Sequence, residues 1–413
     1  MEWFRQAKFG MFIHWGLYAV PAGEWKGRTN YAEWIQLEAN LPTAEYAKFA
    51  DQFNPEKFDA KAWMKVAKGA GMKYVVITAK HHDGFCLWPT KLSDWSICRT
   101  PWWQRTHRDP LKELAAACRE AGLIFCLYYS VPDWNYPDFP SQYSQTGMKW
   151  NPNAFHGSPK PDADIKKYAA YMKGQLKELL TQYGPVGIIW FDGGGSFKGV
   201  NRGELLGGKD IITLIHQLQP GCLINNRLDG NLGDYGTPEQ KIPGAKQTAA
   251  FEVCMTLNKH WGYNKFDQHW KPAREVICKL ADIASKGGNF LLNVGPTASG
   301  EFPSDAVRIL GEVGKWTAVN GEGIYRATAS PFDKAPSWGR VTAGPGKLYL
   351  HVLNWPTDGK LILACSAKPT QAWLLADRTA CDVKQDAGSI TISVPAKAPD
   401  RYDSVIVLGI PGS

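Results

Sequence analysis

The stretch YVVITAKHHDGFCLW, residues 74–88, decides the fold that we expect. Residues 74–79 are apolar or β-branched and predict a buried strand, and two histidines, an aspartate and a glycine follow at once. Such a polar run occurs where a strand simply leaves the core. It also occurs at the carboxyl end of a parallel strand, where barrel enzymes hold their catalytic residues. The rest of the chain has to decide between these interpretations.

The same strand pattern recurs along the chain and alternates with helical segments. The sequence predicts strands at 8–16, 74–82, 123–130, 186–194, 222–230, 248–255 and 288–296, and helices at 58–71, 111–122, 163–183, 209–218 and 272–286. Apolar strands separated by helices predict a parallel sheet covered on its outer side. We therefore expect a (β/α)8-like barrel, with irregularity allowed. A doubly wound sheet is the alternative, but the GxGxxG fingerprint typical of such a sheet does not follow the first strand.

The pattern changes after about residue 325. Helical periodicity fades, and short strand patterns are joined by Gly, Pro and Asp turns. This spacing predicts a small antiparallel β-sandwich. We therefore expect a catalytic barrel over 1–328 and a C-terminal β-sandwich domain over 329–413.

Composition and charge limit the classes of partner that we expect for this protein. The net charge is +8, but the basic residues are scattered, so we expect no nucleic-acid partner. No apolar run reaches the length of a membrane span, and no signal peptide is visible. We expect an exported protein, periplasmic or secreted, whose leader is absent from this chain, with a cytoplasmic location as the alternative. Eighteen Trp suit sugar binding as well as packing.

Polar and aromatic residues gather at the predicted strand ends. They are His14, His81, His82, Tyr128, Tyr129, Trp190, Asp192, Asn225, Asn226, Arg227, Glu252 and Asn293. The carboxyl ends of parallel strands meet at one end of a barrel, so these side chains are expected to converge there. Their chemistry suits a pocket for a polyhydroxylated ligand.

Asp192 is the candidate nucleophile, because it ends an apolar strand beside Trp190 and precedes three glycines. Glycoside hydrolysis with retention needs a second carboxyl group about 5–5.5 Å away. Glu239, Glu252 and Glu33 are the candidates, and the residue pattern leaves the choice among them open.

A metal site is the rival interpretation. His14, His81, His82 and Asp192 include suitable ligands for a barrel metal hydrolase. Neighbouring strand residues point to opposite faces, however, and neither HxH nor HExxH occurs. We therefore expect no metal.

Several motifs together resemble the α-L-fucosidases of glycoside hydrolase family 29. They are KFGMFIHWGLYAVPAGEW, KHHDGFCLWPT, YYSVPDW, WFDG, INNR and SKGGNFLLNVGP, and they cover about residues 3–325. The resemblance implies a (β/α)8-like barrel followed by a β-sandwich. It also implies a retaining exo-α-L-fucosidase that needs no cofactor and acts on fucosylated oligosaccharides or glycoconjugates. A fucose-binding protein without activity and a metal-dependent barrel hydrolase are the alternatives.

The resemblance also implies roles for single residues. Asp192 corresponds to the family's nucleophile. The implied sugar-binding residues are His14, Glu33, Trp34, His81, His82, Tyr129, Trp190 and Arg227, with Tyr128 as the alternative to Tyr129. The position of the acid/base varies within the family and falls here on Glu239 or on Glu252. We favour Glu239. Linkage preference and oligomeric state do not follow from the sequence.

Overall fold

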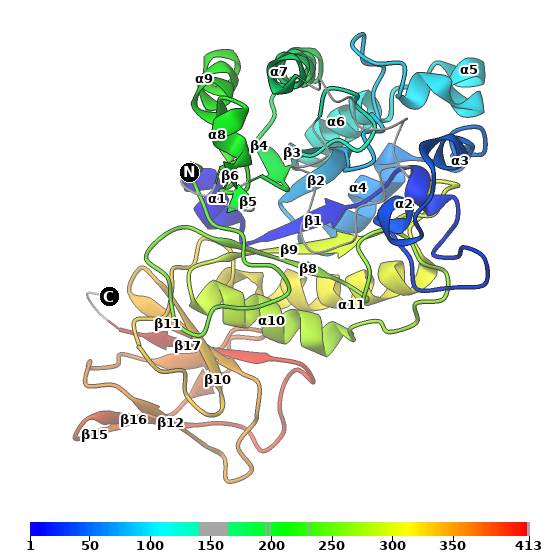
Figure 1. Ribbon diagram of the computed structural model, residues 1–413. Helices are drawn as coiled ribbons and strands as arrows, with labels where there is room; N and C mark the ends of the chain where they lie inside the picture. Colours follow the sequence, from blue (N-terminus) through cyan, green and yellow to red (C-terminus); the bar gives the residue numbers. More distant parts are fainter. Residues whose placement is uncertain (140–163, 195, 198–199, 230–231, 411–413) are drawn as a thin grey trace.

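The N-terminal part of the chain is built on a curled parallel sheet. The computed structural model describes residues 1–139, 164–194, 196–197, 200–229 and 232–410 (Figure 1). Among these residues, seven parallel strands pair in the order β7-β4-β3-β2-β1-β9-β8. They are β1 Phe9–Ile13, β2 Tyr74–Lys80, β3 Ile124–Ser130, β4 Ile188–Asp192, β7 Leu223–Ile224, β8 Glu252–Thr256 and β9 Asn289–Val294. The predicted barrel-like α/β fold is confirmed, and the opening stretch supplies the central strand β2.

The segment 234–240 links the two edge strands of this sheet. It forms parallel bridges from Asn225 to Tyr235 on the β7 side, and from Gly236 to Phe251 and Glu239 to Cys254 on the β8 side. The amide of Gln240 donates to the carbonyl of Cys254 at 2.9 Å. The segment therefore occupies the place of an eighth strand. Pro238 lacks an amide hydrogen and Gly236 lacks a side chain, so a continuous ladder is not formed.

The predicted strand 222–230 is shorter than expected. Only Leu223–Ile224 pair with β4, because the side chain of Asn225 then takes over the pairing. Its Oδ1 accepts from the amide of Phe191 at 3.0 Å, and its Nδ2 donates to the carbonyl of Phe191 at 2.9 Å. A side-chain amide thus replaces one backbone residue in the sheet and frees the chain to turn.

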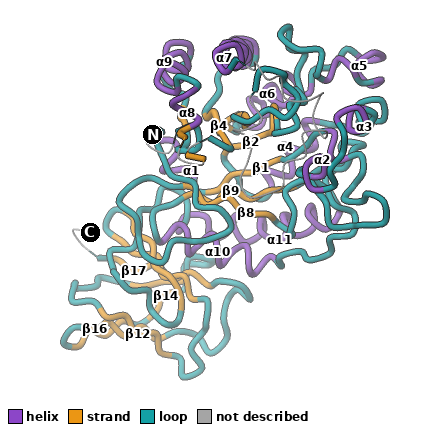
Figure 2. Tube along the Cα trace, viewed as in Figure 1, coloured by secondary structure: helices purple, strands orange, loops and turns teal. Residues whose placement is uncertain are grey.

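Helices cover the outer side of the sheet (Figure 2). The longer ones are α4 Ala60–Gly69, α6 Pro110–Ala121, α7 Ile165–Gln182, α9 Gly208–Leu218, α10 Ala273–Ser285 and α11 Ser304–Asn320. Shorter ones are α1 Glu2–Ala7, α2 Ile35–Glu38, α3 Thr43–Ala47, α5 Pro101–Thr106 and α8 Arg202–Leu205. Asp59, Asp109 and Asp164 each accept a backbone amide hydrogen and so fix the starts of α4, α6 and α7. No described helix is both long and apolar enough to cross a bilayer.

The C-terminal part is built of antiparallel strands, as expected. One sheet has the order β10-β11-β17-β13-β14 and a second the order β12-β16-β15. The strands are β10 Gly339–Gly344, β11 Lys347–Val352, β12 Lys360–Ala364, β13 Ala372–Leu374, β14 Ala380–Cys381, β15 Val383–Asp386, β16 Ser389–Ser393 and β17 Ser404–Gly409. Leu350 and Leu408 of the first sheet share one hydrophobic core with Leu361 and Ile390 of the second.

The other face of the larger C-terminal sheet packs on the barrel helices, with β10 against α10 and His351 of β11 against Trp316 of α11. Tyr349, Val405 and Val407 belong to the same hydrophobic core as the barrel. The indole of Trp316 donates to the carbonyl of Asp403 at 2.8 Å across this junction. The C-terminal sheet therefore packs directly on the barrel helices.

Candidate active site

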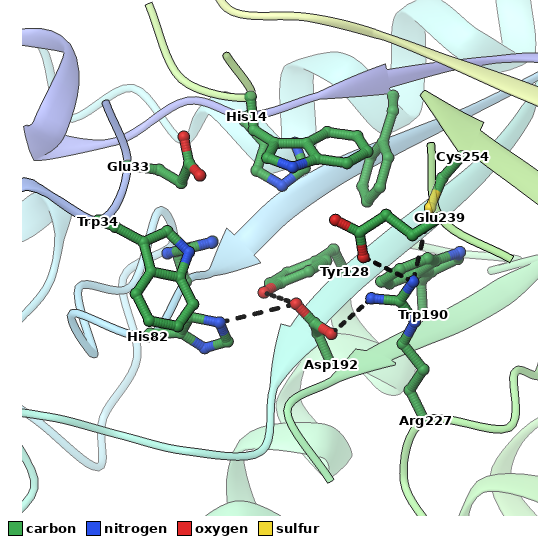
Figure 3. Close-up of a pocket in the computed structure, with 13 residues that line it drawn as sticks. His14, Glu33, Trp34, His82, Tyr128, Trp190, Asp192, Arg227, Glu239 and Cys254 are labelled. Atoms are coloured by element: carbon green, nitrogen blue, oxygen red, sulfur yellow. Dashed lines mark hydrogen bonds and ion pairs between the residues drawn. The ribbon is translucent and has the colours of Figure 1, made fainter. Parts of the chain in front are cut away.

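A cavity of about 220 Å³ opens at the carboxyl ends of the barrel strands (Figure 3). It is lined by Phe12, His14, Glu33, Trp34, His81, His82, Tyr128, Trp190, Asp192, Arg227, Glu239, Cys254 and Trp261. The lining residues come from strands that are far apart in sequence. Most of the residues predicted from strand ends are therefore brought together here, whereas Tyr129, Asn225, Asn226, Glu252 and Asn293 do not line the cavity.

Asp192 ends strand β4 and faces this cavity with 23% of its side chain exposed. Its Oδ1 accepts from Nη1 of Arg227 at 2.8 Å, and its Oδ2 accepts from the hydroxyl of Tyr128 at 3.0 Å. Nε2 of His82 lies 3.6 Å from Oδ2. Burial alone would raise the pKa of Asp192. The charges of Arg227 and His82, together with the two hydrogen bonds, outweigh burial and hold that pKa below its usual value. Asp192 is therefore an ionised carboxylate at neutral pH.

Arg227 connects the two carboxylates of the pocket. Its Nη2 lies 2.9 Å from Oε2 of Glu239, while Nη1 contacts Asp192. Nε donates to the hydroxyl of Thr237 at 2.8 Å, and the guanidinium lies 4.6 Å above the ring of Trp190. The planar fork is thus fixed on four sides and holds both carboxylates close together.

Glu239 reaches the pocket because of its place in the eighth-strand segment. The bridge to Cys254 fixes its backbone, and 42% of its side chain is exposed at the mouth of the cavity. A carboxyl group in this position is accessible to solvent and to any part of a ligand that leaves the cavity through its mouth.

Glu252 lies beneath the pocket and does not line it. It is fully buried, accepts from the indole of Trp190 at 2.7 Å and accepts a second, short hydrogen bond from the hydroxyl of Tyr74. Burial raises the pKa of Glu252 to about 7. These partners place Glu252 inside the barrel, against Trp190.

Glu33 lines the opposite side of the cavity from Glu239 (Figure 3). Its Oε2 accepts from the amide of Gly262 at 2.8 Å, and burial raises the pKa of its carboxyl to about 7. Glu33 can therefore be protonated near neutral pH and can serve as a donor or an acceptor to a ligand.

The protonation state of His14 follows from its neighbour. Nδ2 of Asn293 donates to the carbonyl of Trp261 at 2.7 Å, which leaves Oδ1 of Asn293 as an acceptor. Nδ1 of His14 lies 2.7 Å from that oxygen and must carry the proton. Burial lowers the pKa of His14 to about 3, so the ring is neutral and Nε2 is its acceptor.

The other two histidines differ in their partners. The hydroxyl of Ser130 donates to the carbonyl of Pro132, so Nδ1 of His82, 2.6 Å away, is the donor to Ser130. His81 stacks on Tyr128 with ring centroids 5.5 Å apart. Burial and the nearby His82 lower the pKa of His81 well below its usual value, so its ring is neutral. These contacts fix both rings before a ligand arrives.

Tyr129, the tyrosine favoured for sugar binding, does not line the cavity, whereas its alternative Tyr128 does. Successive strand residues point to opposite sides of the sheet, and the pocket side belongs to Tyr128. The hydroxyl of Tyr129 donates to Gln175 of α7 at 2.7 Å, and the ammonium of Lys80 lies 4.4 Å above its ring. Tyr129 thus packs between the sheet and its helix layer.

Three lining residues were not predicted. Phe12 and Cys254 lie within strands and face inward, and Trp261 follows β8 and lies 5.1 Å from the ring of His14. Trp261 could have been predicted as a pocket residue from the sequence, because an aromatic residue after a predicted strand end suits a sugar pocket. Phe12 and Cys254 look like ordinary core residues. Across the described ranges, no group of three His, Cys, Asp or Glu side chains is arranged to hold a metal ion.

The geometry can be compared with known proteins. A family model described as Alpha-L-fucosidase matches residues 1–322. The chain belongs to the α-L-fucosidase family. The tissue α-L-fucosidase of Rattus norvegicus is 31% identical over 397 residues, covering 90% of this chain and 80% of that protein. The Dictyostelium discoideum α-L-fucosidase is 28% identical, covering 97% of this chain and 90% of that protein.

Solved structures agree with this family assignment. α-L-Fucosidase isoenzyme 1 from Paenibacillus thiaminolyticus matches with a TM-score of 0.89 and 38% identity, over 99% of this chain and 98% of that one. A family 29 α-L-fucosidase from Bacteroides thetaiotaomicron, trapped as a covalent intermediate with 2-fluoro-fucosyl fluoride in a Glu-to-Gln mutant, matches at 0.87 and 33% identity. It covers 99% of this chain and 95% of that one. This α-L-fucosidase family member is therefore an enzyme, a retaining glycoside hydrolase of family 29.

Proposed function

We propose that this enzyme removes terminal α-L-fucose from fucosylated oligosaccharides or glycoconjugates, with Asp192 as nucleophile and Glu239 as acid/base. The observation that carries the assignment is the Arg227 fork, which contacts both carboxylates at the pocket wall. Glu252 does not line the pocket, and Glu33 stands on the side away from Glu239. The pair of Asp192 and Glu239 is the one that retention requires.

In the first step, an ionised oxygen of Asp192 bonds to C1 of the sugar while the glycosidic bond breaks. Glu239 donates its proton to the departing oxygen. In the second step, Glu239 takes a proton from water, whose oxygen bonds to C1 as the ester to Asp192 breaks. The exposure of Glu239 at the mouth suits both the departure of the leaving group and the entry of water.

Arg227 serves both steps through its contacts with the carboxyl groups of Asp192 and Glu239. While Asp192 is ionised, the guanidinium is paired with that carboxylate, and Glu239 can hold the proton that the first step needs. In the covalent intermediate, the ester of Asp192 is uncharged, so Arg227 faces one carboxylate and stabilises Glu239 in the basic form that the second step needs.

The remaining lining groups suit a neutral deoxysugar. Nε2 of His14 is an acceptor for a sugar hydroxyl, and the rings of Tyr128 and Trp190 lie nearly parallel, 17° apart, as an apolar wall. Neutral imidazoles pair with hydroxyl groups without attracting charged ligands. Glu252 acts through Trp190 as a positioning residue, because it holds the indole nitrogen from below.

The test uses an aryl α-L-fucoside. Asp192→Asn should lower turnover by several orders of magnitude with an unchanged circular-dichroism spectrum. Unchanged turnover would refute the nucleophile assignment. Azide separates the two glutamates, because it can replace water without a general base. Glu239→Ala should regain rate in azide and release fucosyl azide, whereas the matched variant Glu252→Ala should not. The reverse result would move the acid/base role to Glu252.

A further inference from the structure

A second cavity, of about 590 Å³, lies at the opposite end of the barrel from the active site. It is bounded by helix α1, by residues 247–250 ahead of β8, by the start of β9, and by 326–329, which lead into the C-terminal domain. In Figure 1, α1 stands at the end of β1 that lies away from the arrowhead. This cavity takes no part in the mechanism above.

The lining of this second cavity is strongly basic. Its charged residues are Arg5, Lys8 and Arg326 against the single carboxylate of Glu2, which gives a net charge of +2. Glu2 already accepts a hydrogen bond from the side chain of Gln6 at 3.0 Å. Within the described ranges, no carboxylate lies within 4 Å of any of the three cations.

Lys8 is the most informative of the three. Only 3% of the residue is exposed, and the hydrogen bond of its ammonium, to the carbonyl of Gly287, is long at 3.5 Å. Burial and the charge of Arg5 lower the pKa of Lys8 to about 8. A buried ammonium without a counter-ion is costly, and proteins normally pair such a group.

The backbone holds these cations in place. Lys8 and Arg326 both adopt left-handed conformations, with φ of 58° and 62°, which are unfavourable for residues other than glycine. The amide of Arg326 donates to the carbonyl of Gln6 at 3.2 Å and ties the interdomain segment to α1. The surroundings of these two residues therefore hold their backbone in a conformation that they would not adopt on their own.

We propose that this basal cavity, defined by Arg5, Lys8 and Arg326, binds a doubly charged oxyanion, a phosphate or sulfate group. The lining charge of +2 matches a dianion, whereas a carboxylate would leave one positive charge unmatched. Guanidinium forks also fit tetrahedral oxyanions well. The bound group would join α1, the base of the barrel and the interdomain segment. This inference does not depend on the proposed catalytic roles.

The proposed dianion site can be tested by isothermal titration calorimetry of the full chain with inorganic phosphate and with inorganic sulfate. The ionic strength is kept constant with chloride. We expect saturable binding at one site per chain and a rise in melting temperature with either dianion. Acetate should bind at least tenfold more weakly. Absence of saturable binding, or acetate binding as tightly as sulfate, would overturn the proposal.

Arg326→Asn removes one cation and suits the left-handed backbone, so it should fold and lose at least tenfold in affinity. Arg378→Asn is the matched control, because Arg378 has a φ of 64° and lies outside the basal cavity. Lys8→Met should abolish binding, and Arg5→Gln is the exposed alternative if the buried variant does not fold. Unchanged affinity in both Arg326→Asn and Arg5→Gln would refute the site. Fucoside hydrolysis should be unchanged in the three arginine variants.

Discussion

Replacing Arg227 by methionine tests the central arrangement of the active site. The guanidinium donates one charged hydrogen bond to Asp192, at 2.8 Å. A hydrogen bond to a charged group contributes about 1.5–3 kcal/mol, which corresponds to a factor of roughly 10–150 in rate. The carboxylate charge of Asp192 develops as the ester breaks, so this interaction is stronger in the second transition state than in the intermediate. We expect kcat to fall by that factor through the second step.

The assay is pre-steady-state hydrolysis of an aryl α-L-fucoside with mass spectrometry of the enzyme. Arg227→Met should show a burst of phenol and an accumulated fucosyl-enzyme. The acid limb of the kcat/KM profile should move to higher pH, because burial then dominates the pKa of Asp192. Arg227→Lys keeps the positive charge but not the planar fork of donors. Its kcat should therefore lie between that of the unaltered enzyme and that of Arg227→Met. Unchanged kcat with no accumulated intermediate and an unmoved acid limb would refute the reasoning.

Two further predictions concern Tyr128, which lines the pocket, and Glu252, which lies beneath it. Tyr128→Phe removes a hydrogen bond to the proposed nucleophile Asp192 and should lower kcat/KM by roughly 10–150-fold, whereas Tyr129→Phe, on the other face of the same strand, should stay within about threefold in the same assay. A larger loss in Tyr129→Phe would contradict the pocket geometry. The raised pKa of Glu252, about 7 against 4.5, means that its neutral form stabilises the fold fully below pH 4.5 and that this contribution is lost as the pH rises through 7. Glu252→Gln should flatten the fall in urea-unfolding free energy over that window, and an unaltered slope would count against a buried neutral carboxyl.

The barrel could be predicted because its strands are apolar on both faces and end in polar residues. The same property prevented the sequence from showing whether Tyr128 or Tyr129 faces the pocket. Where both faces of a strand are buried, neither periodicity nor hydrophobicity tells which side faces the pocket. The partners Gln175 and Asp192 settle this choice, and they lie on other elements of the fold.

The choice between Glu239 and Glu252 shows a second limit of prediction from the sequence. Glu252 lies on a strand pattern and Glu239 in a Gly- and Pro-containing loop pattern, so local sequence ranks neither as the pocket residue. The answer depends on which backbone fills the gap between the edge strands, and that gap exists only in the closed fold. The tautomer of His14 is likewise set by Asn293, which lies 279 residues further along the chain.

The segment 234–240 is held to its neighbours by isolated bridges and not by a continuous ladder. Insertions or deletions there leave the registers of β7 and β8 untouched. Glu239, on this segment, is therefore less tightly tied to the sheet than Asp192, which ends the paired strand β4. The proposed acid/base thus stands on backbone whose length can change, whereas the proposed nucleophile stands on a strand whose register is fixed.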